Sequence, residues 1–194
     1  MDTALIIEAI ERHIKPEKNE RDYFLSLLNE KTMKRRDYLL HEGEVCKQSA
    51  FVLSGCLRSY SVDRNGFEHI LQFAPRGWWI ADIASLITKQ PAKLNIDALE
   101  DTELLLLSRE DQLILFDKVP KFERFFRVMV ENSIAANHNR LLDYMGLSAI
   151  ERYEMFCKRY PTLVQSLPQK QIAFYLGVTP EFLSKMKAEL LRKK

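Results

Sequence analysis

Apolar residues recur along the chain with two different periods, and the changes of period mark its parts. Helical spacing near the N-terminus predicts helices at about Ala4 to His13 and Glu20 to Leu28. Short apolar runs follow between residues 31 and 73, and two more lie at Leu94 to Ala98 and Leu104 to Ser108. Runs of this length, bounded by Gly, Asn and Asp, are typical of strands. They predict an antiparallel roll or barrel in this region.

A hairpin turn is the clearest local signal among these strands. Asn65 and Gly66 separate the apolar runs at residues 57–62 and 69–73. An Asn-Gly pair adopts the positive φ angles of a two-residue hairpin turn at low cost. The two runs are therefore expected to pair as antiparallel neighbours.

Helical spacing returns from Pro120 to Met145. About 25 residues at roughly 1.5 Å each make a rod of about 38 Å. Its apolar stripe is wide enough to cover the roll on one side and a second copy of the helix on the other, which predicts a homodimer. The alternative is a helix buried wholly within one subunit. The residues expected at the dimer interface are Phe126, Val130, Ile134, Leu141 and Met145.

These patterns predict an α+β chain with three parts. Residues 1–119 form a roll with flanking helices, residues 120–146 form the dimerisation helix, and residues 147–194 form a C-terminal helical domain. A short helix from Ala149 to Tyr160 is expected to end at Pro161, because the residue before a proline disfavours helical geometry.

Residues 169–188 have the pattern of a helix-turn-helix, which makes DNA the first partner to consider. Ala173 is small enough for a second helix to cross closely, and Gly177 supplies a left-handed turn. Thr179 suits an N-cap, and Pro180 suits the first helical position. The alternative is an ordinary helical hairpin whose lysines are merely solvated.

The second helix of this pair is amphipathic. Leu183, Met186 and Leu190 share one face at 100° per residue, and polar residues occupy the other. In a major groove, Lys185 can donate to guanine and Glu181 can accept from cytosine. The residues expected to contact DNA are Gln169, Lys170, Thr179, Glu181, Ser184, Lys185, Lys187 and Arg192, with Lys193 and Lys194 at phosphates.

Any attraction to nucleic acid must be local, because the net charge of the 194 residues is only +2. The last ten residues provide a local positive charge, because they hold five basic side chains and one acidic side chain, Glu189. No signal peptide and no apolar run of membrane-spanning length is present, so we expect a cytoplasmic protein without a membrane partner.

The chain shows no signature of catalysis or of a metal site. Its four histidines are scattered, and it contains no HExxH, GxSxG or P-loop motif. Cys46, Cys56 and Cys157 include no CxxC pair, which disfavours an iron-sulfur cluster. We therefore expect a protein that is not an enzyme and that carries no cofactor, with the cysteines as core residues and Cys46 as a weak redox candidate.

Four segments carry a family resemblance: Phe51 to Arg58, Asp63 to Gly66, Gly77 to Ile80, and Ala98 to Asp101. Together with the order of long helix and helix-turn-helix, they resemble the Crp/Fnr transcription regulators. The resemblance implies a homodimer that sets two recognition helices into a near-palindromic site, with RNA polymerase as a further partner. Glu181 and Lys185 fall on the base-reading positions, although arginine is common where Lys185 stands.

The effector pocket of that family departs from its pattern here. Cyclic-AMP-binding members hold the ribose with a Gly-Glu-Leu run and the cyclic phosphate with the arginine of a Pro-Arg-Ser-Ala-Thr run. This chain has Asp82 in the first run and Ala92 in place of the arginine, while Lys93 is expected to point away. Losing that contact costs about 2 to 5 kcal/mol, so we predict no tight cyclic nucleotide binding.

An unidentified small molecule remains a candidate effector. Aromatic side chains at the mouth of the roll suit a planar or acyl ligand, or else they simply fill the core. The residues of this candidate pocket are Phe73, Trp78, Trp79, Asp82 and Asn95. A competing hypothesis for the whole chain is a ligand-sensing or protein-interaction module that has lost DNA binding.

Overall fold

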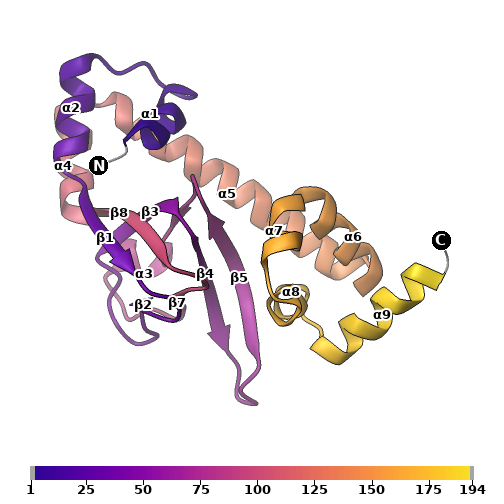
Figure 1. Cartoon of the computed structure of the whole chain (residues 1–194). Coiled ribbons are helices and arrows are strands. Elements are labelled where there is room, and N and C mark those ends of the chain that lie inside the picture. Colours follow the sequence, from indigo (N-terminus) through magenta and orange to yellow (C-terminus); the bar gives the residue numbers. More distant parts are fainter. Residues whose placement is uncertain (1–2, 193–194) are drawn as a thin grey trace. The chain divides into compact units, whose positions relative to one another are not determined.

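The computed structural model describes residues 3–192, with side chains through residue 189. In chain order, its elements are α1 (Ala4–Glu11), α2 (Lys18–Ser26), β1 (Asn29–Met33), β2 (Tyr38–Leu40), β3 (Gln48–Ser54), β4 (Cys56–Val62), β5 (Glu68–Pro75), β6 (Trp79–Ile80), α3 (Ile83–Thr88), β7 (Asn95–Ala98), β8 (Thr102–Ser108), α4 (Arg109–Lys118), α5 (Lys121–Gly146), α6 (Ala149–Arg159), α7 (Pro161–Ser166), α8 (Gln169–Leu176) and α9 (Pro180–Arg192) (Figure 1).

The strands form two antiparallel four-stranded sheets that make up the roll. One sheet has the order β1-β8-β3-β6 and the other β2-β7-β4-β5. In the first sheet, Leu105 of β8 lies opposite Glu30 of β1 and Phe51 of β3. In the second, Ser59 of β4 lies opposite Ile96 of β7. The α+β class and the antiparallel roll predicted from the sequence are confirmed.

The core follows the two-residue period of β3 and β8. Val52 and Leu104 are buried in a cluster with Leu57 and Ile96 of the other sheet. Their chain neighbours point to the opposite face of the first sheet, where a second cluster forms with α1, α2, α4 and α5. That cluster includes Ile6, Phe24, Phe51, Leu105, Leu115, Phe122 and Phe125. Each fully buried Phe or Leu side chain stabilises the fold by about 1.5 to 3 kcal/mol.

Two helices after the roll begin close to where the sequence predicts, α5 at Lys121 and α6 at Ala149. α5 is one continuous helix. α6 starts with a capping box: the Ser148 side chain accepts from the main-chain N–H of Glu151, and the Glu151 carboxylate accepts from the main-chain N–H of Ser148. α6 ends at Arg159, and Pro161 then starts the short helix α7. Proline fits a first helical position because no N–H is needed there.

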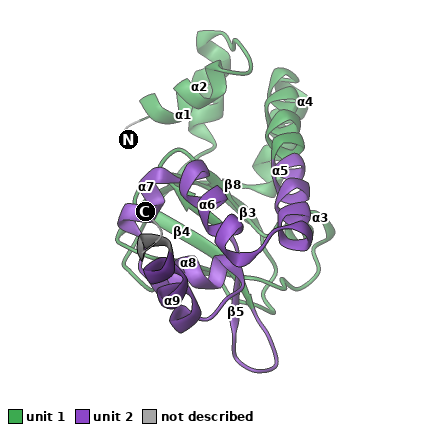
Figure 2. Cartoon of the chain, turned by 90° about the vertical axis from the view of Figure 1, so that its right-hand side faces the viewer, with its two compact units in different colours: residues 1–61, 72–132 green, residues 62–71, 133–194 purple. Residues whose placement is uncertain are grey.

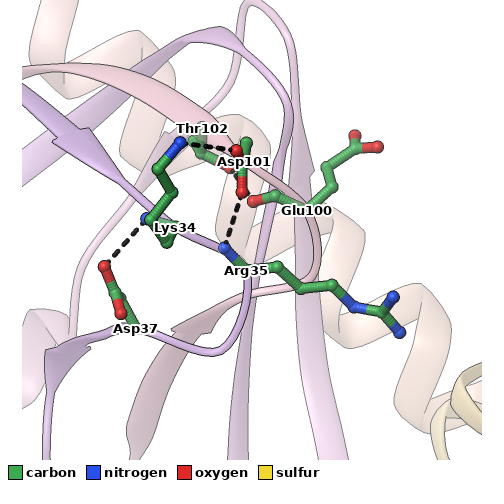
Figure 3. Close-up of polar contacts among 6 residues, drawn as sticks. All are labelled: Lys34, Arg35, Asp37, Glu100, Asp101 and Thr102. Carbon is green, nitrogen blue, oxygen red and sulfur yellow. Dashed lines mark hydrogen bonds and ion pairs between the residues drawn. The ribbon is translucent and has the colours of Figure 1, made fainter.

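The turn before β8 is held by the turn between β1 and β2 (Figure 3). Asp101 accepts from the Lys34 ammonium at 2.9 Å and from the Arg35 main-chain N–H at 3.0 Å. The hydrogen bond from Lys34 is the main reason that the pKa of Asp101 is lowered. Gly55, between β3 and β4, has a φ of 84° and lies against the main chain of Asp101 and Thr102. This close approach leaves no room for a Cβ.

Two compact units divide the chain (Figure 2). Unit 1 contains residues 1–61 and 72–132, and unit 2 contains residues 62–71 and 133–194. Unit 2 therefore joins the tip of the β4–β5 hairpin to the second half of α5 and the C-terminal helices. Within it, Arg140 of α5 donates to the carbonyls of Ile70 and Leu71, and the rings of Phe67 and Phe174 lie 4.8 Å apart.

Candidate nucleic-acid interface

α8 and α9 are joined by a tight turn that the sequence builds residue by residue. Gly177 ends α8 in the left-handed conformation, with φ 70° and ψ 35°. The main-chain N–H of Val178 then donates to the carbonyl of Ala173, which is fully buried. Thr179 Oγ1 accepts from the N–H of Phe182 at 3.2 Å, so its side chain caps α9.

α9 has one packed face and one exposed face. Leu183 and Met186 are buried, whereas Glu181, Ser184 and Lys185 are exposed. The Ser184 hydroxyl donates to the carbonyl of Pro180 at 2.9 Å, which leaves its oxygen free to accept from a ligand. The exposed face therefore presents an acceptor, a hydroxyl and a cation side by side.

The other predicted DNA contacts lie on α8 and α9 and in the turn between them. Gln169, Lys170 and Thr179 are exposed, and the ammonium of Lys187 lies 5.7 Å from the ring centre of Tyr153. Some of the predicted positions lie outside the part of the chain that is described: the side chains of Leu190 and Arg192, and the whole of Lys193 and Lys194.

Phe182 is an exposed residue that the sequence pattern did not single out. Phe182 is 50% exposed, and helical periodicity places it on α9 between the exposed Lys185 and the buried Met186. An aromatic side chain at such a place can contact the methyl group of thymine. Its signal in the sequence was weak, because an aromatic residue within a helix is ordinarily assigned to the core.

The residues predicted at the dimer interface differ in exposure. Val130, Ile134, Leu141 and Met145 are exposed, with Met145 at 77% and Leu141 at 58%. Phe126 is partly buried and packs against Trp79 and Phe116, each with its ring centre 5.5 Å away. The second half of α5 thus leaves large apolar side chains in contact with solvent.

Asp82, a residue of the predicted effector pocket, is hydrogen-bonded to the main chain of this same protein. Asp82 is buried at the start of α3 and accepts from the N–H of Ser85 at 2.9 Å and from the N–H of Lys93 at 3.2 Å. Ala92 is buried and Lys93 is exposed. The Asp82 carboxylate therefore occupies two main-chain donors, one at the start of α3 and one in the loop before β7.

The other four residues of that candidate pocket differ in their burial and in their contacts. Trp79 packs on Phe51 in the second cluster, between the first sheet and the helices, and not between the two sheets. Trp78 is 41% exposed, Phe73 is buried, and the Asn95 side chain accepts from the N–H of Glu42. A pocket formed by all five residues stays a prediction.

Residues 30–118 match the family model of the cyclic nucleotide-binding domain. This segment contains every strand of the roll except the first residue of β1. No protein of curated function is similar enough in sequence to match the chain.

Solved structures share the fold over most of the chain. FixK2 from Bradyrhizobium japonicum is 19% identical, with a TM-score of 0.73 over 86% of this chain and 85% of that one. CLP, the c-di-GMP responsive global regulator from Xanthomonas campestris, is 13% identical, with a TM-score of 0.76 over 91% and 93%. A Eubacterium rectale protein assigned to the crp/fnr family of transcriptional regulators is 17% identical, with a TM-score of 0.72 over 92% and 85%. At these identities the likeness shows the fold.

Metal binding and membrane insertion have no visible basis in residues 3–192. No group of three or more His, Cys, Asp or Glu side chains there could hold a metal ion. No helix in the same range has both the length and the apolar content needed to cross a bilayer.

We expect cyclic AMP and cyclic GMP to bind no more tightly than the high micromolar range. The phosphate would meet Ala92 in place of an arginine, and Asp82 would repel it from the main-chain donors that the carboxylate already occupies. Calorimetric titration of the purified chain with each nucleotide checks this. A dissociation constant in the low micromolar range would refute the prediction.

Proposed function

We propose that the chain is a sequence-specific DNA-binding transcription regulator that acts as a homodimer. The observation that carries this proposal is the exposed face of α9, where Glu181, Ser184 and Lys185 stand on a capped helix after the Gly177 turn. A helix with this entry geometry enters a major groove through its first turns. The fold shared with FixK2 and CLP supports the same role.

Dimerisation through α5 would complete the DNA-binding unit. One helix-turn-helix contacts only a few base pairs, and two of them in a symmetric dimer read successive major grooves about 34 Å apart. The exposed apolar residues Ile134, Leu141 and Met145 give α5 a face that a second copy can cover. This arrangement predicts a near-palindromic binding site.

Selection of genomic DNA fragments by the purified chain, at moderate salt and without added nucleotide, tests the proposal. Enrichment of a near-palindromic motif is expected. The roll would then be able to influence transcription only by favouring one arrangement of the two recognition helices. Recovery of no common motif would contradict the assignment of α9 to the major groove.

Lys185→Ala is expected to weaken binding to the selected site by about 1 to 3 kcal/mol and to relax the preference at one base pair. Lys185 is exposed and none of the contacts described involves its ammonium, so the substitution should leave the fold intact. Competition binding against sites with single base changes measures both effects.

Lys18→Ala is the matched control, because it removes the same charge from an exposed position on α2. It should leave both affinity and base preference unchanged. Equal losses in the two variants would mean that Lys185 contributes only general electrostatic attraction.

A further inference from the structure

A small cavity in unit 2 is lined by arginine and tyrosine side chains. It has a volume of about 60 Å³, and its lining comes mainly from the second half of α5, α6 and the end of α8, which are drawn in purple in Figure 2. We call it the arginine–tyrosine cavity, and its defining residues are Arg140, Arg152, Arg159, Tyr144, Tyr160 and Tyr175.

The lining has an excess of positive charge. Its three guanidinium groups face a single carboxylate, that of Asp143, in the lining. Among the described residues, none of the three arginines forms an ion pair. Arg140 donates instead to the carbonyls of Ile70, Leu71 and Tyr175, which satisfy hydrogen bonds but carry no net charge.

Burial makes this excess of charge unfavourable. The pKa of Arg140 is lowered mainly because burial disfavours the charged form, and the nearby positive charge of Arg159 lowers it further. A charge in such a place is ordinarily compensated by an opposite charge. An anion inside the cavity would supply that compensation.

Arg152 has a hydrogen-bond donor without an acceptor. Its terminal nitrogens donate to the carbonyls of Leu147 and Leu176 at 2.8 and 3.2 Å. Its Nε–H is buried and has no partner among the described residues. A buried donor of this kind points to a bound water or ion. The Tyr175 hydroxyl in the same lining is protonated and uncharged, because burial raises its pKa to about 12, and a hydrogen bond with Tyr160 contributes to the shift.

The geometry points to the arginine–tyrosine cavity as a binding site for a phosphate-type oxyanion. A volume of about 60 Å³ holds a few water molecules, so one tetrahedral oxyanion fits and a nucleotide base does not. Met155 and Arg159, both exposed, lie in the lining and give access from solvent. Guanidinium groups bind such oxyanions through paired, charge-assisted hydrogen bonds.

The site would act on the end of α8. Arg140 and Arg152 donate to the carbonyls of Tyr175 and Leu176, the last two residues before the Gly177 turn. An oxyanion that orders these two guanidinium groups would fix the end of α8, and therefore stabilise unit 2. The cavity thus offers a place for a ligand signal within the C-terminal helices themselves.

Calorimetric titration of the full chain with inorganic phosphate, without DNA and at constant ionic strength, tests the site. Saturable uptake of one phosphate per chain is expected. Arg159→Gln should weaken it by about tenfold, because one charged hydrogen bond contributes about 1.5 kcal/mol or more. Arg152→Gln should weaken it at least as much. Arg159 is exposed and its guanidinium lies 5.5 Å from the ring centre of Tyr160, so its variant should fold even if the Arg152 variant does not.

Lys158→Gln is the matched control. Lys158 is the exposed neighbour of Arg159 on α6, and its loss changes the net charge equally outside the lining. It should bind phosphate like the unmodified chain. No saturable uptake, or equal affinity in the Arg159 and Lys158 variants, would overturn the proposal. The measurement needs no DNA, so its result is independent of the proposed DNA binding.

Glycerol phosphate, titrated in the same way, distinguishes the two sources of this ligand chemistry. Tighter binding of the free ion would assign inorganic phosphate, and tighter binding of the ester would assign the phosphoryl group of an organic metabolite. Either result keeps the oxyanion site.

Discussion

Ile134→Glu combined with Leu141→Glu is expected to convert the chain to a monomer and to lower its affinity for a palindromic site by about 10²- to 10⁴-fold. The two residues lie close together in angle on α5 and are 50% and 58% exposed. Carboxylates there would be buried opposite each other in a dimer, which is strongly unfavourable. Loss of the dimer removes the effective concentration that joins two half-sites. Sedimentation and titration with the selected DNA measure both effects.

Asn132→Glu combined with Asn139→Glu is the control for this pair. It adds the same two charges at the same spacing, at exposed positions on the opposite side of α5. These substitutions should leave dimerisation and DNA binding intact. A stable dimer in the Ile134 and Leu141 variant would show that this face of α5 is not the interface.

The roll and the turn between α8 and α9 could be predicted from sequence because their signals are local. β3 and β8 bury alternate residues on two faces, as Val52 beside Phe51 and Leu104 beside Leu105 show. The turn at Gly177 needs a left-handed residue, and few residues other than glycine supply one. Such patterns require no knowledge of distant contacts.

β1 and α4 are two of the elements that escaped prediction, because their side chains do not follow the usual pattern. β1 buries only Met33 and exposes most of its polar residues at the edge of its sheet. α4 buries Gln112 and leaves Leu113 and Ile114 exposed, so its apolar spacing is not that of an amphipathic helix. Its remaining signal was the N-cap at Ser108, whose side chain accepts from the N–H of Asp111.

The sites show the same division between local and distant information. The exposed face of α9 follows from helical periodicity alone. That Asp82 accepts from Lys93 depends on a loop closing back on the start of α3, which no spacing reveals. The arginine–tyrosine cavity joins residues from three helices, and its arginines read in sequence as ordinary solvated charges.

Gly55→Ala is expected to destabilise the roll by about 2 to 5 kcal/mol. A residue with a Cβ at a φ of 84° costs about 1 to 2 kcal/mol. The added Cβ would also lie 2.8 Å from the Cα of Thr102 and overlap the carbonyl of Asp101, for a further 1 to 3 kcal/mol or so. Movement of Asp101 away from the added Cβ is resisted, because Lys34 and Arg35 donate to the Asp101 carboxylate (Figure 3).

Gly43→Ala separates the two causes. Gly43 has a φ of 90°, but no atom lies within 4 Å of the place that an added Cβ would take, so its replacement should cost only the backbone part, about 1 to 2 kcal/mol. Urea unfolding followed by tryptophan fluorescence measures both variants within unit 1, because Trp78 and Trp79 are the only tryptophans of the chain. Equal losses at positions 43 and 55 would mean that the approach of Gly55 to Asp101 and Thr102 contributes nothing to the stability of the roll.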